Sequence, residues 1–248
     1  MWNRAFPLFA AVFALSLMMP ACRKADQTPA GYGRDIQVPK LVLSPSLEPR
    51  RAEFVDEARA AVGIVKEFAG RHGWDSLAVE PFMDSVMVFD DKRAFDRTLL
   101  SLVGADTATV LPAGYCAALE QRVLVAVTPE IYSRTYPDGI EEGSYAKLMA
   151  HEMCHRLHIR VLEGDEEAMG PVWFFEGFAV YAAGQLASPG RGLSPAELRK
   201  VLDDPERGDY RLYRLALEHY LGKATLPELV ARAGGKGFDE WLRSLDGK

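Results

Sequence analysis

Two histidines four residues apart, His151 and His155, constrain the fold more than any other feature of this chain. Positions four apart on an α-helix lie about 40° apart around its axis, so both imidazoles can reach one ion. Glu152 is turned about 100° away from His151, where it can contact a water on that ion but cannot easily bind the ion itself. The segment therefore predicts a metal-binding helix, over residues 144–161, with a general base beside the metal.

A hydrolytic zinc site usually has three protein ligands and leaves its fourth position to water, so a third ligand is expected downstream. One group of candidates lies in a charged segment that is typical of a solvated turn: Glu163, Asp165, Glu166 and Glu167. Glu176 differs, because it lies in the apolar segment 172–181, where an unpaired carboxylate would be costly. A bound cation would remove that cost, and Glu176 is the predicted third ligand.

The composition is that of an ordinary globular protein, with 248 residues of which 48% are hydrophobic and 26% are charged. The net charge of −6 gives no electrostatic attraction to the phosphate backbone of nucleic acid, which excludes nucleic acid as a partner. The three cysteines, Cys22, Cys116 and Cys154, are too few and too far apart for a disulfide framework or a four-cysteine zinc module. We expect Cys116 and Cys154 to be buried free thiols.

The first residues have the features of an export signal. Arg4 precedes an apolar stretch over residues 5–19, which is too short to span a bilayer but long enough for a signal-peptide core. Residues 1–21 are thus a predicted signal peptide. Residues 22–49 contain four prolines and no sustained periodicity, which predicts a linker, and the folded domain is expected over residues 50–248.

The end of the apolar stretch, residues 17–22, resembles a bacterial lipobox, with Ala21 directly before Cys22. The resemblance implies that Cys22 is lipidated and anchors the chain to a membrane in the bacterial cell envelope. Arg23 follows the cysteine, which by the same resemblance favours the outer membrane, with the domain facing the periplasm. The alternative is a plain secretory signal that is cleaved nearby.

Hydrophobic periodicity predicts an α+β fold in which a small, mostly antiparallel sheet is followed by a helical half. A helix is predicted over residues 51–69, a strand over 85–89 and a helix over 92–103. Two β-prone runs, 107–118 and 122–127, are close enough to pair as a hairpin. After Pro129 the clear patterns indicate helices, over residues 144–161, 172–183, 195–202, 210–221, 226–233 and 238–245.

Two motifs together resemble the gluzincin clan of zinc metallopeptidases: His-Glu-Met-Cys-His at residues 151–155, and Trp-Phe-Phe-Glu-Gly-Phe-Ala at residues 173–179. The resemblance implies a zincin-like fold with an active-site helix. It also implies one Zn²⁺ per chain and Glu152 as the general base. The implied zinc ligands are His151, His155 and Glu176.

Departures from the family pattern limit what the resemblance implies. Val180 stands four residues after Glu176, where some gluzincins place a carboxylate outside the ligand set, so the group that orients the histidines is unassigned. The metzincin pattern does not fit, because His158 and Val161 stand where it requires glycine and histidine. His158 itself lies one turn beyond His155, and we expect it to face solvent or to support the ligands, with a functional role as the alternative.

Gluzincins commonly stabilise the transition state with a tyrosine or a histidine, and the candidates are Tyr210 and Tyr213 in the predicted helix 210–221. The alternative is that these tyrosines pack in the core. The expected activity is hydrolysis of a peptide or protein substrate, which an edge strand within residues 107–127 would hold in an extended form. The rival interpretation is a non-catalytic envelope protein of the same fold that binds a metal or another protein.

Overall fold

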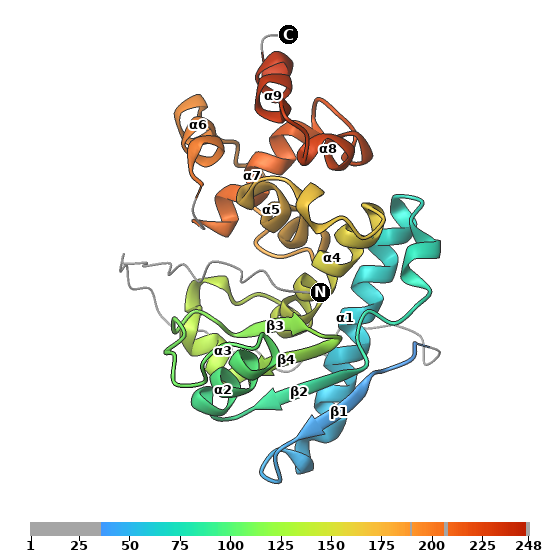
Figure 1. Ribbon diagram of the computed structural model, residues 1–248, viewed down its shortest axis with the longest axis vertical. Coiled ribbons are helices and arrows are strands. Elements are labelled where there is room, and N and C mark those ends of the chain that lie inside the picture. The colour runs from blue at the N-terminus through green and yellow to red at the C-terminus, as the bar shows by residue number, and fades with distance from the viewer. Residues whose placement is uncertain (1–35, 189, 206–207, 247–248) are drawn as a thin grey trace.

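The computed structural model describes residues 36–188, 190–205 and 208–246; the predicted signal peptide and Cys22 lie outside these residues. The described chain has an α+β fold, as predicted, with a sheet at one end and a stack of helices at the other (Figure 1). One hydrophobic core runs through both parts, from Leu41 in the sheet to Leu242 in the last helix. The two ends therefore belong to one folded unit.

The sheet has the strand order β1-β2-β4-β3, and its strands are β1 (Lys40–Leu43), β2 (Ser85–Phe89), β3 (Ala117–Glu120) and β4 (Val123–Val127). β1 pairs parallel with β2, β2 pairs parallel with β4, and β3 pairs antiparallel with β4. The prediction of a mostly antiparallel sheet was wrong, because the sheet is mixed. Parallel pairing requires long crossover connections, in which the chain here forms α1 (Arg51–Arg71) and α2 (Lys92–Leu102).

Strand β1 lies inside the segment predicted to be a linker, residues 22–49. Leu41 is 7% exposed and pairs with Val86 of β2, and Leu47, just after the strand, is 4% exposed. The folded domain therefore includes β1 and does not begin at residue 50. The strand escaped prediction because it is four residues long, lies between two prolines and buries only one of its side chains.

The hairpin of β3 and β4 is confirmed, but its first strand is shorter than predicted. The backbone N–H of Thr109 donates to the Asp106 carbonyl at 3.0 Å, so part of the predicted strand 107–118 forms a turn instead. Gln121 and Arg122 connect the strands with φ values of 46° and 64°, which is typical of a two-residue type I′ hairpin turn. β3 forms one edge of the sheet.

Helix α3 (Pro129–Thr135) begins at the proline after which helices were expected, and no bounds were predicted for it. The remaining helices follow the predicted bounds closely: α4 (Ser144–Val161), α5 (Val172–Ala182), α6 (Pro195–Asp203), α7 (Tyr210–Leu221), α8 (Leu226–Ala233) and α9 (Phe238–Asp246). Capping boxes begin α6 at Ser194 and α8 at Thr225, which explains why their first residues were predictable. The predicted helical half is confirmed. Helix α4 contacts the sheet and α1 on one side and α5 on the other, and α5 packs on α7 (Figure 1).

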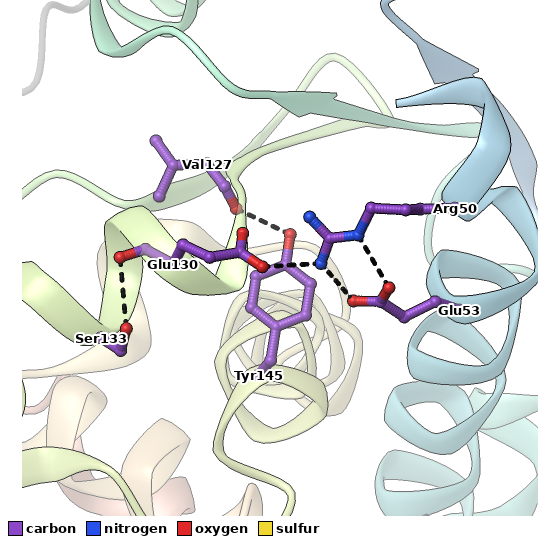
Figure 2. A network of polar contacts seen from close by, with 6 residues as sticks. All are labelled: Arg50, Glu53, Val127, Glu130, Ser133 and Tyr145. Atoms are coloured by element: carbon purple, nitrogen blue, oxygen red, sulfur yellow. Dashed lines mark hydrogen bonds and ion pairs between the residues drawn. The ribbon is translucent and has the colours of Figure 1, made fainter. Parts of the chain in front are cut away.

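A polar network fixes the start of α4 to the sheet (Figure 2). The Tyr145 hydroxyl, in the first turn of α4, donates to the carbonyl of Val127 at the end of β4, at 2.7 Å. Arg50 lies beside this contact and bridges Glu53 of α1 and Glu130 of α3, at 2.6 and 2.8 Å. The helix that carries the histidine pair is therefore anchored at its N-terminal end.

Candidate metal centre

Helix α4 presents His151 and His155 together, as their spacing predicts. Their Nε2 atoms are 3.1 Å apart, and their rings are nearly perpendicular, at 84°. The side chain of His151 is 8% exposed and that of His155 is 21% exposed, so one ring is buried and the other borders solvent. The same nitrogen of each ring therefore points to one place at the edge of the core.

Glu176 reaches the same place from α5. Its Oε2 atom lies 3.2 Å from Nε2 of His151 and 3.6 Å from Nε2 of His155, and its side chain is 1% exposed. At the next residue, Gly177, α7 packs so close that a Cβ there would lie 2.8 Å from the carbonyl oxygen of Tyr213. Glu176 thus directs its carboxylate toward the histidines, while Gly177 lets α5 and α7 pack closely.

The spacing of the three atoms fits a metal ion. With zinc bonds of about 2.0–2.1 Å, the ligand atoms of a tetrahedral site lie about 3.3 Å apart. The distances here are 3.1, 3.2 and 3.6 Å, and within the described part of the chain His151, His155 and Glu176 form a group of potential ligands within 4.8 Å of one another. Two imidazoles and one carboxylate are also a donor set that hydrolytic zinc sites use.

No protein-family model, curated protein or solved structure matches the chain. The gluzincin resemblance therefore stays a prediction from the two motifs. The assignment of a metal centre rests on the convergence of the three side chains.

Gln185 contacts the buried histidine and was not anticipated from the sequence. Its Oε1 atom lies 2.9 Å from Nδ1 of His151, on the opposite side of the ring from Glu176. Burial lowers the pKa of His151, but the hydrogen bond with Glu176 and the charge of Glu152 more than offset it, so the pKa lies above its usual value. The only sequence signal for Gln185 is the preceding Gly184, which marks the end of α5.

Glu152 is half-buried on α4 and lies toward the edge strand. Its negative charge acts on His151 and on Glu120, the last residue of β3. Burial raises the pKa of the Glu120 carboxyl, Arg156 opposes this effect and Glu152 adds to it. The Glu152 charge is therefore close enough to act both on the histidine pair and on the last residue of the edge strand.

The acidic segment after α4 is apart from the ligand group. Glu163, Asp165 and Glu167 are exposed and Glu166 is half-buried. The Asp165 carboxylate accepts the backbone N–H of Glu167 at 3.1 Å and caps a short 3₁₀ helix. These residues form the solvated turn that their composition predicts, and Glu176 is the acidic residue that converges on the histidines.

The two candidate tyrosines of α7 have different surroundings. The ring of Tyr210 lies 5.9 Å from that of His151, so it borders the ligand group. Tyr213 is 2% exposed, and its hydroxyl oxygen accepts the backbone N–H of Gly208. Tyr210 is therefore the better candidate for a group that contacts a substrate, and Tyr213 has the packing role named as its alternative.

His158 does not face solvent, contrary to one of its predicted roles. It is 0% exposed and stacks on Phe178 with ring centroids 4.3 Å apart, and neither ring nitrogen has a hydrogen-bond partner. Burial, followed by the charge of His155, lowers its pKa to about 3. It is therefore a neutral imidazole held among aromatic rings.

The prediction that Cys116 and Cys154 are buried free thiols is confirmed. Burial raises the pKa of the Cys116 thiol to about 11 and also raises that of Cys154, so both are protonated at neutral pH. Within the described residues, none of the helices combines the length and apolar character needed to span a bilayer. Cys22 and its predicted lipid lie outside those residues.

Proposed function

We propose that this chain is a zinc-dependent peptidase of the bacterial cell envelope. The observation that carries the proposal is the convergence of His151, His155 and Glu176 from two helices, with distances of 3.1 to 3.6 Å between their ligand atoms. The resemblance of the two motifs to gluzincins supports the same conclusion. The next residue on α4, Glu152, supplies the base that a purely structural site would not need.

Each nearby side chain has a distinct task in the proposed reaction. A bound zinc ion would polarise the scissile carbonyl and make a water molecule more acidic. Glu152 would take one proton from the attacking water and pass it to the departing amine nitrogen, which leaves the carboxylate ready for another cycle. Tyr210 is the proposed donor to the oxygen of the carbonyl, where negative charge develops.

The edge strand β3 supports a peptide as the substrate. It lies at the edge of the sheet, pairs on one side with β4 and contacts α4, the helix of the histidine pair. An extended peptide could add to its free side through backbone hydrogen bonds, which bind any sequence, while side-chain pockets would give specificity. The scissile bond would then lie over the ligand group.

The proposed location depends on the N-terminal segment. A signal peptide over residues 1–21 and a lipid on Cys22 would place the folded domain on a membrane facing the periplasm. Cys22→Ser should release the protein into the soluble fraction. Wild-type protein that is soluble and cleaved at a site other than before Cys22 would contradict the lipid anchor.

Substitution of the base is the direct test of the activity. Glu152→Gln keeps the shape of the side chain, so zinc content and thermal midpoint should match the wild type. Hydrolysis of a peptide library should fall by about 10²- to 10⁴-fold, the usual contribution of a positioned proton acceptor. Zinc content, thermal midpoint and hydrolysis are measured side by side for the two proteins.

Two outcomes would change the proposal. If the wild type binds zinc and hydrolyses no peptide, the rival interpretation replaces it, and the chain is a non-catalytic module that binds metal or protein. If wild type and Glu152→Gln hydrolyse peptides equally, the reaction uses another base.

A further inference from the structure

We infer that Gln185 is the positioning residue of the metal centre, and that it holds His151 in the orientation that binds the metal. The inference rests on the metal site of the proposed function. It assigns to a neutral amide the place that some gluzincins give to a carboxylate on α5. Val180, at the corresponding position of this chain, cannot do so because its side chain is apolar.

The contact between the two side chains sets which nitrogen of His151 is free to bind. The amide oxygen of Gln185 only accepts hydrogen bonds, and it lies 2.9 Å from Nδ1 of His151. A neutral imidazole that donates to this oxygen carries its proton on Nδ1, which leaves the lone pair of Nε2 directed toward Glu176 and His155. This is the protonation state that a metal ligand needs.

The end of α5 fixes the backbone of Gln185. The N–H of Gln185 donates to the Val180 carbonyl at 3.0 Å, and the N–H of Gly184 donates to the Tyr181 carbonyl at 3.1 Å. Gly184 has a φ of 69°, which completes a Schellman motif. The turn therefore brings Gln185 back toward the same helix face that presents Glu176.

Two further contacts hold this segment from outside α5. Arg214 of α7, which is 9% exposed, donates to the carbonyl of Gln185, and its Nε donates to Glu218 at 2.8 Å. The N–H of Leu186 donates to the Glu141 carboxylate at 3.2 Å, from the segment just before α4. The Gln185 side chain thus extends from a backbone that is held on both sides.

The neutral amide has a consequence for the charge of the site. Gln185 orients His151 without adding a negative charge, so among the ligands and this partner only Glu176 is anionic. A carboxylate in place of the Gln185 amide would make the His151 imidazole a stronger ligand, so the site would bind the metal more tightly. Gln185 therefore gives orientation while leaving more positive charge on a bound zinc ion.

Two substitutions separate orientation from packing. Gln185→Met keeps the length and approximate shape of the side chain and removes the acceptor, whereas Gln185→Glu keeps an acceptor oxygen. The matched control is Gln37→Met, because Gln37 is exposed and precedes β1. Zinc affinity is measured by competition with a chelator, and each protein is also loaded with Co²⁺ to record the visible absorption of the metal. The thermal midpoint of the metal-free proteins shows whether each variant folds.

We expect Gln185→Met to lose about 10- to 100-fold in zinc affinity and to change the Co²⁺ spectrum. Gln185→Glu should bind zinc at least as tightly as the wild type, and Gln37→Met should not differ from it. If Gln185→Met changes only the thermal midpoint, Gln185 merely packs and the inference is wrong. If Gln185→Met does not fold, a Gln185→Glu protein that folds and binds zinc more weakly than the wild type would also overturn it.

The same measurements distinguish this inference from the proposed function. A wild type that binds zinc and loses affinity on Gln185→Met, but hydrolyses no peptide, supports the positioning role and contradicts the peptidase. If the wild type hydrolyses peptides and Gln185→Met binds zinc as tightly as the wild type, the peptidase is supported and the positioning role is contradicted. A wild type that binds no zinc contradicts both.

Discussion

Helix α4 (Ser144–Val161) carries histidines in opposite environments at two places, one near its middle and one close to its C-terminal end. Near the middle, His151 and His155 converge with a carboxylate, and His151 also contacts an amide. Less than one turn beyond, His158 is 0% exposed, stacks on Phe178 and has no hydrogen-bond partner. The first place gathers polar groups that suit a cation, and the second buries a neutral ring.

The comparison shows that neighbouring helices, and not the residue type, decide what each histidine does. Helix α5 supplies both environments, because Glu176 faces the pair and Phe178, two residues later, covers His158. The pKa of His151 is raised, although burial lowers it, because charges and acceptors surround the ring. The pKa of His158 is lowered to about 3, because burial dominates.

Removal of the Glu176 carboxylate should have the largest effect on the candidate metal centre. Glu176→Ala takes away one of the three proposed ligands, so zinc affinity should fall by more than the roughly 10- to 100-fold that loss of a partner outside the ligand set costs. Glu163→Ala and Glu166→Ala are the controls, because both residues lie in the acidic segment after α4. The zinc content of the purified proteins is measured by metal analysis. Full zinc content in Glu176→Ala would refute Glu176 as the third ligand.

Substitution of the two tyrosines should separate catalysis from packing. Tyr210→Phe should lower kcat by about 10²- to 10³-fold with zinc content unchanged, if its hydroxyl stabilises the developing charge. Tyr213→Phe should keep kcat and lose about 1 kcal/mol of unfolding free energy, because it removes the acceptor of the Gly208 N–H. The same effect on kcat from both variants would contradict the distinction.

A methyl group at Gly177 should disturb both the histidine pair and His158, since Gly177 lies between Glu176 and Phe178. Its Cβ would lie 2.8 Å from the Tyr213 carbonyl oxygen, a backbone atom that cannot rotate away. We expect Gly177→Ala to cost about 3 kcal/mol of unfolding free energy, measured by urea denaturation. Gly192→Ala is the control, because a Cβ there has open space. Equal stability of the two variants would show that α5 and α7 can separate at no cost.

Acid should destabilise the fold through the buried ring of His158. The folded protein keeps this ring neutral down to about pH 3, whereas the unfolded chain takes up a proton below about pH 6.5. Its contribution to stability is therefore complete above that pH and declines as the pH falls, by about 2 kcal/mol between about pH 7 and pH 5. Urea denaturation of the wild type and of His158→Leu at both pH values measures the loss of unfolding free energy that comes from His158. The variant should lack this loss. An identical pH dependence in the two proteins would mean that His158 is charged when folded.

The sequence predicts the helical half better than the sheet, for local reasons. Helix bounds are set by short-range signals such as the capping box at Ser194, and α4, α7 and α8 begin and end where predicted. Strand β1 has no such signal, and its parallel register with β2 joins residues separated by the whole of α1. Thr107 and Thr109 are β-prone, yet a local turn at Asp106 takes precedence.

The candidate site, like the fold, was predicted only in part from the sequence. Spacing alone predicted the convergence of His151 and His155, and the apolar setting of Glu176 predicted the third side chain. Gln185 could not be predicted, because its contact with His151 spans 34 positions and depends on how α5 packs on α4. The burial of His158 depends on the same packing, so its position on the helix could be predicted and its surroundings could not.

The Schellman motif at the end of α5 means that one helix carries both Glu176 and the group that orients His151. Separation of α5 from α4 would therefore remove one proposed zinc ligand, Glu176, and free another, His151, from its orienting contact in a single event. Zinc binding and the docking of α5 are then thermodynamically linked: zinc at about 100 times its dissociation constant would favour the docked state by about 2.7 kcal/mol. In hydrogen–deuterium exchange, the amides of α5, and of α7 packed on it, should exchange more slowly when zinc is bound, with little change in β1 at the far edge of the sheet.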